Sequence, residues 1–221
     1  GYIGRRLKQK LLLDENVQLK LLVRNKKSVC ELEKKVEIIE GDTFNKDALR
    51  IALKDVDTAY YLIHSLSNGN YKDLDKISAQ NFLDIANECG VKRIIYLGGL
   101  GVKNEHTSEH LLSRIETGEI LSSNKNVQAI WFRAGVIIGS GSACFEIIRN
   151  LTEKLPVMTT PKWVNTLAQP ISIDDVLSYL QEAVSIETKE NLIVDIGSKA
   201  LTYKEMMIGT ANALGLKRII I

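Results

Sequence analysis

The chain has 221 residues, of which 45% are hydrophobic, so it is long enough to bury a full core. Its 29 basic and 27 acidic residues are interspersed and leave a net charge of +2, which argues against a surface built for nucleic acid. The apolar runs are shorter than the roughly 18 residues that span a bilayer. We therefore expect a cytoplasmic protein that binds neither nucleic acid nor membrane.

The first residues, Gly1-Tyr2-Ile3-Gly4, match the second half of a glycine fingerprint that leads from a buried strand into a dinucleotide-binding helix. In that motif one glycine lets the backbone approach the pyrophosphate and another lets the helix pack on the sheet, and Gly1 and Gly4 fit these roles. A bare G-x-x-G also fits an ordinary helix start. If the fingerprint is real, we expect an apolar strand of about ten residues upstream of residue 1.

Short apolar segments alternate with segments of helical spacing, which predicts parallel strands covered by helices on both faces. The expected strands are residues 17–23, 36–39, 58–63, 91–97 and 127–132. A first helix buries Ile3, Leu7 and Leu11, and a short one at 45–53 is capped by Asn45. A longer helix carries one apolar stripe and ends at Gly90; the stripe comprises Leu74, Ile77, Ser78, Phe82, Ile85 and Cys89.

After Gly139 the alternation is less regular. Helices are expected at 142–153, 174–185 and 202–214, with a strand at 192–196 and a proline-punctuated stretch at 156–170. The predicted fold class is therefore α/β. We expect a Rossmann-like doubly wound parallel sheet, its first strand upstream of residue 1, with a small C-terminal α/β elaboration on the substrate side.

Six segments appear in a recognisable order: residues 1–4, 22–25, 40–42, 56–61, 90–97 and 132–139. They resemble the landmarks of the extended and atypical short-chain dehydrogenase/reductase family. Further segments are closer to one atypical branch of bacterial NAD(P)-binding proteins, which are nucleoside-diphosphate-sugar-epimerase-like or NmrA-like and several of which carry a C-terminal domain of the DUF2867 type. These segments are Ser65 and residues 108–111, 133–135, 139–143, 155–159, 161–164 and 169–171.

The resemblance implies an NAD(P)-binding Rossmann core at residues 1–139 and a substrate-side region at 140–221 packed on the same domain. It places the pyrophosphate at the helix that starts near Tyr2, beside Gly1, Ile3 and Gly4, where backbone amides and the helix dipole favour an anion. After the second strand of the family fold, Arg24 and Asn25 replace the acidic residue that selects NAD. A cation there suits a 2′-phosphate, so we favour NADP(H) over NAD(H).

The other cofactor contacts follow from the same resemblance. Asp42 and Thr43 fall where the family holds the adenine edge, although Asp42 also fits a turn or cap. Three groups of residues are expected beside the nicotinamide and its ribose: Ile63, His64 and Ser65; Gly98 and Gly99; and Arg133, Ala134 and Gly135. A histidine at position 64 also fits a structural role. The spacing of the three cysteines fits no metal motif, and we expect no metal.

The catalytic positions depart from the family pattern. Family members use a Ser and a Tyr-x-x-x-Lys pair, whereas this chain has Gly98-Gly99 in place of the Ser and His110 with Arg114 in place of the pair. Residues four apart share a helix face. Three roles remain open for His110: a catalytic acid, a cofactor or substrate contact, or a structural residue. Arg114 would hold ribose hydroxyls or an anionic substrate and would lower the pKa of His110.

Two functions are favoured by these residues, and a third, nucleotide-sugar epimerisation, is disfavoured because in the family it also relies on the Tyr-x-x-x-Lys pair. One is an NADP(H)-dependent oxidoreductase that acts on an unidentified small carbonyl or sugar-like molecule. The other is a non-catalytic NADP(H)-binding sensor or scaffold of the NmrA-like type, favoured by the loss of the Ser-Tyr-Lys set. Trp163 is a candidate for the substrate wall, a homodimer contact or core packing.

Overall fold

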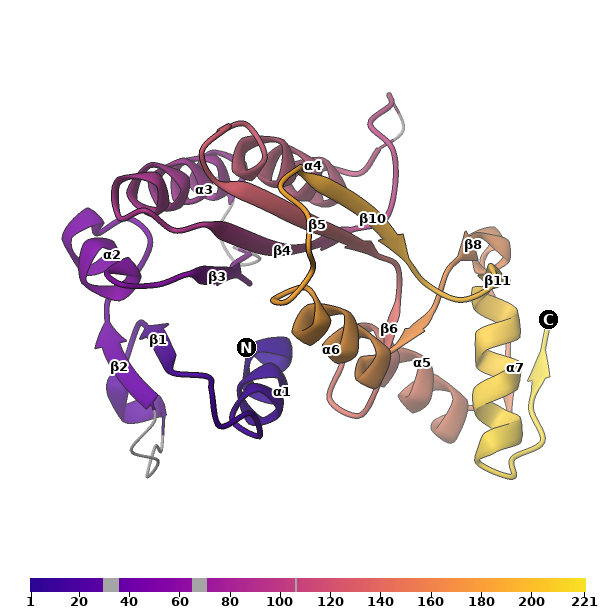
Figure 1. Cartoon of the computed structure of the whole chain (residues 1–221). Helices are drawn as coiled ribbons and strands as arrows, with labels where there is room; N and C mark the ends of the chain where they lie inside the picture. The colour runs from indigo at the N-terminus through magenta and orange to yellow at the C-terminus, as the bar shows by residue number, and fades with distance from the viewer. Residues whose placement is uncertain (30–35, 65–70, 106) are drawn as a thin grey trace. The chain divides into compact units, whose positions relative to one another are not determined.

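Figure 1 shows the computed structural model, which describes residues 1–29, 36–64, 71–105 and 107–221 and confirms an α/β fold. Ser65, one of the predicted cofactor contacts, lies outside the described residues. The chain divides into two compact units. The first unit contains Gly1, Ile3–Arg133 and Leu177–Val194, and the second contains Tyr2, Ala134–Val176 and Asp195–Ile221.

A four-stranded sheet has the order β10-β5-β4-β3. Its strands are β3 (Thr58–Tyr61), β4 (Arg93–Gly99), β5 (Gln128–Ala134) and β10 (Leu192–Ile196). β3 and β4 run parallel, with Thr58 opposite Arg93 and Tyr61 opposite Tyr96. The run from Ile94 to Gly98 is buried throughout, as expected for a strand that is covered on both faces.

Several predicted strand boundaries are wrong at this sheet, and two of them lie beside predicted site residues. The third predicted strand was extended to residue 63, but β3 ends at Tyr61, so residues 62–64 leave the sheet and carry His64 beyond the strand end. The fourth was ended at residue 97, but β4 continues through Gly98 and Gly99. Glycine has a low strand propensity, so this pair resembles a loop in sequence although close packing requires it in the strand.

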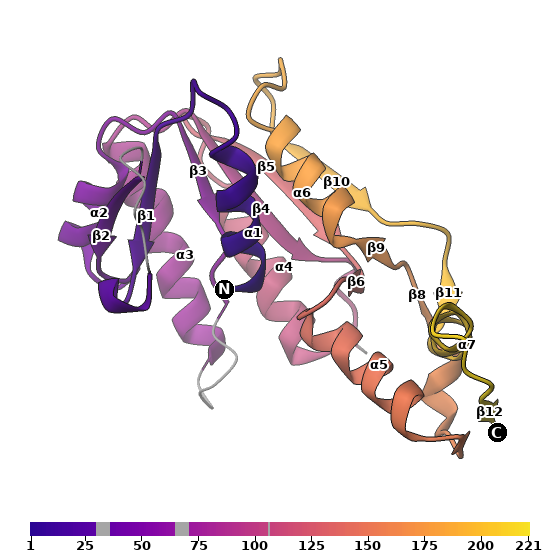
Figure 2. The same cartoon turned by 90° about the horizontal axis from the view of Figure 1, so that it is seen from below.

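A separate parallel pair is formed by β1 (Leu19–Val23) and β2 (Val36–Glu40), in register from Leu19 opposite Val36 to Val23 opposite Glu40. Figure 2 shows these two strands side by side, and α2 (Lys46–Leu53) packs against both. The predicted cap of α2 is confirmed, because the Asn45 side chain accepts a hydrogen bond of 3.0 Å from the backbone N–H of Ala48. In α1 (Tyr2–Leu11), Leu7 and Leu11 are buried as predicted.

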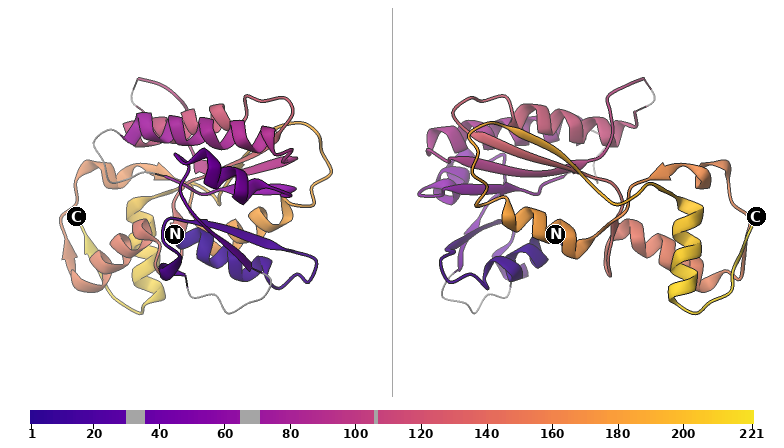
Figure 3. Two further views of the ribbon diagram at one scale, coloured as in Figure 1. Left: turned by 90° about the vertical axis from the view of Figure 1, so that its left-hand side faces the viewer. Right: turned by 45° about the vertical axis from the view of Figure 1, so that its right-hand side comes forward.

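Helices α3 (Tyr71–Glu88) and α4 (Glu109–Leu121) lie side by side on one face of the four-stranded sheet, as Figure 3 shows. Gly90 follows α3 with φ of +74°, which is the left-handed conformation predicted for its end. Ile77 is 49% exposed, so its assignment to the buried stripe is wrong. The buried face contains Ser78, Phe82 and Ile85 of the predicted stripe, together with Asp75 and Ala79, which the prediction omitted.

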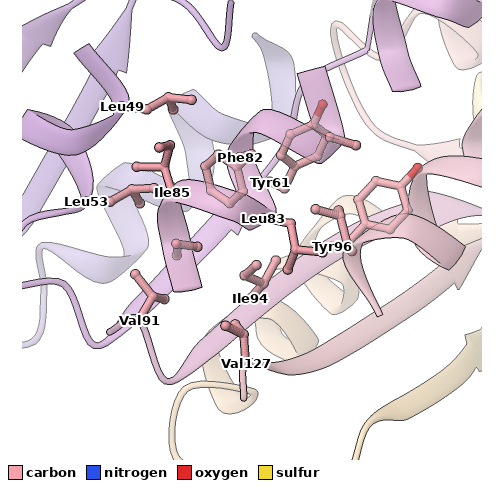
Figure 4. Close-up of a cluster of buried hydrophobic side chains, with 14 of the residues drawn as sticks. Leu49, Leu53, Tyr61, Phe82, Leu83, Ile85, Val91, Ile94, Tyr96 and Val127 are labelled. Carbon is pink, nitrogen blue, oxygen red and sulfur yellow. The ribbon is translucent and has the colours of Figure 1, made fainter. Parts of the chain in front are cut away.

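The core of the first unit is a cluster of buried side chains from the sheet, α2 and α3, part of which Figure 4 shows. Leu49 is fully buried within it, whereas Ile51 on the same helix is 58% exposed. We expect Leu49→Ala to lower the free energy of unfolding by roughly 2–5 kcal/mol through lost burial and a residual cavity. Ile51→Ala is the matched control and should change it by no more than about 0.5 kcal/mol in chemical denaturation. Equal effects would contradict this packing.

The second unit has its own core, built from Val136, Ile148, Met158, Val164, Met206 and Met207. Its helices α5 (Ala143–Lys154) and α7 (Tyr203–Ala213) pack against each other. Thr202 and Glu205 form a reciprocal capping box at the start of α7. The predicted helices and the strand at 192–196 are confirmed, except that α6 (Ile173–Glu182) ends three residues early.

Short strand pairs complete this part of the chain. β6 (Ile137–Ile138) pairs in parallel with β9 (Ile171–Ser172), and β7 (Val157–Met158) with β12 (Ile219–Ile220). β8 (Leu167–Ala168) pairs antiparallel with β11 (Leu201–Thr202). Among the described residues, no helix is both long and apolar enough to cross a membrane.

Candidate functional site

His64 and His110, 46 residues apart in sequence, are in direct contact in the first unit. His64 lies beyond the end of β3 and His110 in the first turn of α4. The Nε2 atom of His64 is 3.0 Å from the Nδ1 atom of His110, and the ring centroids are 4.6 Å apart. The two rings therefore form a hydrogen-bonded pair, with the roles of donor and acceptor set by their tautomers.

A buried carboxylate stands behind this pair. Asp75 in α3 is 2% exposed, and its Oδ2 atom is 3.0 Å from the Nδ1 atom of His64. The hydroxyl of Ser113 in α4 donates a second hydrogen bond of 2.8 Å to the same oxygen. A buried charge is costly unless it is paired, so Asp75, His64 and Ser113 stabilise one another as a network.

The sequence interpretation missed Asp75. The helical pattern nevertheless indicated that Asp75 is buried, because it lies three residues before Ser78 and seven before Phe82, on the same helix face. Aspartate is almost never fully buried without a partner, so that position pointed to a polar network. The predicted stripe included Leu74 and Ile77 and omitted Asp75.

The pKa of His64 is lowered from its usual value, mainly by burial and then by the positive charge of Arg114, although Asp75 opposes the shift. The pKa of His110 is lowered as well, by burial and by Arg114, again against Asp75. The sequence analysis predicted that Arg114 lowers the pKa of His110, and the structure agrees, although burial is the larger cause. Since unperturbed histidine titrates near pH 6.5, both rings are neutral at physiological pH.

Arg114 follows His110 by one helical turn. Its Nη2 atom donates a 2.8 Å hydrogen bond to the carbonyl of Leu97 at the end of β4. Its Nε atom is buried without a hydrogen-bond partner among the described residues. A Cβ atom at Gly99 would lie 3.5 Å from that Nε, so Arg114 passes directly over the glycine. The orphaned donor marks a place where a bound polar group would satisfy Arg114.

The neighbouring residues Gly98 and Tyr96 have packing roles. A Cβ atom at Gly98 would lie 2.4 Å from Nε1 of Trp131, so a larger residue would collide with the indole. The hydroxyl of Tyr96 donates to the carbonyl of Arg114 at 2.9 Å, and burial raises the pKa of Tyr96 to about 12. Tyr96 is therefore a poor substitute for the family's acidic tyrosine.

The predicted pyrophosphate site is the start of α1. Gly1 is its N-cap, and a Cβ atom at Gly1 would meet no atom within 4 Å, so the space beside the helix end is open. Gly4 lies against the side chain of Leu62, with 3.8 Å between its notional Cβ and the Leu62 Cδ1. The backbone N–H groups of this helix end can donate hydrogen bonds to an anion without any charged side chain. Ile3 belongs to the same first turn.

The predicted 2′-phosphate site follows β1. Arg24 is exposed, and the side chain of Asn25 accepts a 2.9 Å hydrogen bond from the backbone N–H of Lys27. Together with Lys26, these residues form an exposed cationic turn at a strand end. The carboxylate of Glu40 accepts a hydrogen bond of 3.4 Å from the backbone N–H of Lys26.

Asp42 and Thr43 make structural hydrogen bonds after β2. The Oδ1 atom of Asp42 accepts from the backbone N–H groups of Phe44 and Asn45 at 2.9 and 3.1 Å, which is the turn role considered from the sequence. The hydroxyl of Thr43, 3% exposed, is 2.6 Å from that of Ser78. A role at the adenine edge remains a prediction for both residues.

The remaining predicted contacts are distributed over both units. In the first unit, Ile63 is 40% exposed, and the Arg133 guanidinium lies over the Trp131 ring, 5.9 Å from its centroid. In the second unit, Ala134 is buried, and a Cβ atom at Gly135 would lie 2.3 Å from the carbonyl oxygen of Gln169. Tyr2 packs against Gly139 and Gly141 in this same unit.

The second unit also contains an apolar hollow of about 440 Å³, lined by Leu151, Leu155, Val157, Met158, Thr159, Thr160, Pro161, Trp163, Val164 and Met207. Trp163 is 57% exposed and contacts Tyr203 edge-on at 5.7 Å between centroids. Its alternative assignment to the core is therefore wrong, because Val164 fills that place instead. No group of three or more potential metal ligands occurs among the described residues.

Residues 1–133 match the family model described as NAD(P)H-binding. No curated protein matches the sequence significantly. Solved structures share the fold across the whole chain at low identity. MoeE5, described in complex with UDP-glucuronic acid and NAD, has a TM-score of 0.80 and 17% identity, with 100% of this chain and 82% of that chain covered.

Two further structures are similar. A UDP-N-acetylglucosamine 4-epimerase from Bacillus cereus has a TM-score of 0.79 and 17% identity, with 100% of this chain and 82% of that chain covered. A nucleoside-diphosphate-sugar epimerase from Staphylococcus aureus has a TM-score of 0.82 and 15% identity, with coverage of 100% and 76%. At these identities the structures establish the Rossmann fold rather than an activity.

Proposed function

Because the chain belongs to the NAD(P)H-binding family, we propose that it is an NADP(H)-dependent oxidoreductase of the atypical short-chain dehydrogenase/reductase type. Its substrate is a small carbonyl or sugar-like molecule. The sugar-like choice is supported by the fold shared with proteins described as sugar-nucleotide epimerases. When bound, the nicotinamide supplies or accepts the hydride, and the side chains of this chain bind, orient and exchange protons.

One observation carries this proposal: His110, which the family resemblance aligns with the catalytic tyrosine, is hydrogen-bonded through His64 to the buried Asp75. In general acid–base catalysis by histidine, an aligned carboxylate stabilises the imidazolium that forms during proton transfer. We assign proton exchange with the substrate oxygen to His110.

Arg114 takes the position of the family's lysine. Its guanidinium donates to the Leu97 carbonyl and retains the orphaned Nε donor, which suits a ribose hydroxyl or an anionic substrate group. At the other end of the cofactor, the amides at the start of α1 would hold the pyrophosphate, and Arg24 the 2′-phosphate. The cationic turn after β1 is the basis for NADP(H) over NAD(H).

The competing function is a dinucleotide-binding sensor without turnover. A sensor requires the nucleotide site, but it does not require an accessible histidine that is hydrogen-bonded through a second histidine to a buried carboxylate. We therefore favour the oxidoreductase.

A two-direction activity screen separates these functions. The protein is incubated with NADPH and a panel of carbonyl compounds, and with NADP⁺ and the matching alcohols and nucleotide sugars, while the absorbance of the reduced nicotinamide is followed. We expect protein-dependent turnover of at least one substrate pair. Binding of NADPH without turnover in either direction across the panel would contradict the enzyme and favour the sensor.

A further inference from the structure

We propose that Asp75 and His64 are positioning residues that hold the Nε2 lone pair of His110 outward, so that His110 accepts the proton of a substrate hydroxyl. The substrate class is then a secondary alcohol or sugar hydroxyl, which is oxidised. This inference rests on the proposed oxidoreductase function. It goes further by assigning positioning roles to His64 and Asp75. It also names the alcohol as the form of the substrate that fits an unprotonated Nε2 atom of His110.

The hydrogen-bond geometry fixes the tautomers. The Asp75 carboxylate accepts hydrogen bonds only, so the Nδ1 atom of His64, 3.0 Å away, carries a proton. In a neutral ring, the Nε2 atom of His64 then has a lone pair and accepts from Nδ1–H of His110 at 3.0 Å. The remaining nitrogen, Nε2 of His110, is left without a proton.

The location of His110 allows that nitrogen to meet a substrate. His110 is exposed, whereas the side chain of His64 is 17% exposed and Asp75 is 2% exposed. The Nε2 atom of His110 makes no hydrogen bond within the described ranges. Exposure thus rises from the carboxylate to the outer ring, and the free lone pair is at the accessible end of the chain of hydrogen bonds.

The proton and electron transfers balance in the proposed step. The hydroxyl proton of the substrate would move to Nε2 of His110 as the carbinol C–H bond breaks and the C=O bond forms. The nicotinamide of bound NADP⁺, the two-electron oxidant, would accept the hydride. The proton on Nδ1 of His110 can then move to Nε2 of His64. Asp75 remains ionised and stabilises the positive charge shared by the two rings, in the manner of a catalytic triad.

Burial and the positive charge of Arg114 favour the neutral resting pair, against the charge of Asp75. Asp75 in α3 and Arg114 in α4 act on both rings in opposite directions, and Lys72 and Glu109 flank the site as an ion pair with 2.9 Å between Nζ and Oε1. With burial added, the pKa of each ring falls below its usual value. At neutral pH the pair is therefore ready to accept a proton, and it donates one only at lower pH.

Nitrogen NMR of histidine-labelled protein tests the tautomers directly. Long-range ¹H–¹⁵N spectra distinguish a protonated Nδ1 from a protonated Nε2, and His64→Gln and His106→Gln variants assign the signals. At pH 7.5 we expect both His64 and His110 to be protonated at Nδ1 alone. A neutral His110 protonated at Nε2 would overturn the proposal, without any requirement for a known substrate.

The pH profile of alcohol oxidation gives an independent test. Asp75→Asn retains a hydrogen-bond acceptor and removes the charge, so the acid limb of kcat should move down by roughly one pH unit. The plateau kcat should fall by about tenfold, because the imidazolium in the transition state loses its partner. The matched control is Asp73→Asn, an exposed carboxylate of the same helix, which should leave both unchanged.

The outcomes separate this inference from the proposed function. If His110→Gln abolishes turnover while Asp75→Asn retains the wild-type pH profile, the oxidoreductase function is supported. The positioning role of Asp75 and His64 is then refuted. If no substrate turns over although NMR shows the expected tautomers, the oxidoreductase fails while the hydrogen-bond arrangement holds. If Asp75→Asn does not fold, the histidine tautomers of the unmodified protein decide whether Asp75 and His64 position His110 as proposed.

Discussion

Replacement of His110 by glutamine is expected to lower kcat by roughly 10²–10⁴-fold, the usual contribution of a positioned general acid or base. Glutamine retains a polar side chain but cannot take up a proton. Because His110 is in the first turn of α4 and exposed, its loss should leave the core intact. Steady-state kinetics on the best substrate, together with titration of NADPH, measure the two effects separately.

The dissociation constant for NADPH should stay within about three-fold in this variant, since the proposed role lies in proton transfer and not in cofactor affinity. Glu119→Gln, an exposed change on the same helix, serves as the control and should retain wild-type kinetics. Unchanged kcat in His110→Gln would remove His110 from the mechanism. A loss of NADPH binding equal to the loss of turnover would make it a cofactor contact instead.

Arg24→Glu should weaken NADPH binding by about 10- to 100-fold and change NADH binding by less than about three-fold. The substitution removes a charge-assisted hydrogen bond to the 2′-phosphate and places a carboxylate against it. NADH lacks that phosphate, so it loses no such contact. Calorimetric titration of each nucleotide into the variant gives both ratios.

Lys125→Glu provides the control for net charge, because it alters the charge by the same amount at an exposed position in the loop after α4. Its affinities for both nucleotides should match those of the unaltered protein. Equal weakening of NADPH and NADH in Arg24→Glu would refute the proposed cofactor preference. It would assign Arg24 to a part of the site that the two nucleotides share.

Local signals in the sequence predicted most of the fold. Asn45 and Gly90 mark helix ends through interactions within a few residues, and the structure confirms both. Errors arose where packing overrides the local signal. Gly98 and Gly99 belong to β4 because Trp131 and Arg114 lie against them, and no local pattern reveals such contacts.

The site was less predictable, because its parts come from three elements distant in sequence. His110 and Arg114 were identified from their family positions and their spacing, and His64 from its place near a strand end. The bond between His64 and His110 depends on how β3 and α4 pack, which spacing does not specify. Asp75 was missed because the predicted stripe of α3 consisted of apolar residues and Ser78, whereas the buried face also includes this carboxylate.

Calorimetric titration of the intact protein with NADPH and with NADH tests the central claim most directly, because every proposed step depends on a nicotinamide dinucleotide. The account predicts micromolar binding of NADPH, weaker binding of NADH, and a larger loss for NADPH than for NADH in Arg24→Glu. Absence of binding for both nucleotides would contradict it at its base. The glycine fingerprint and the His64–His110 pair would then require a different ligand.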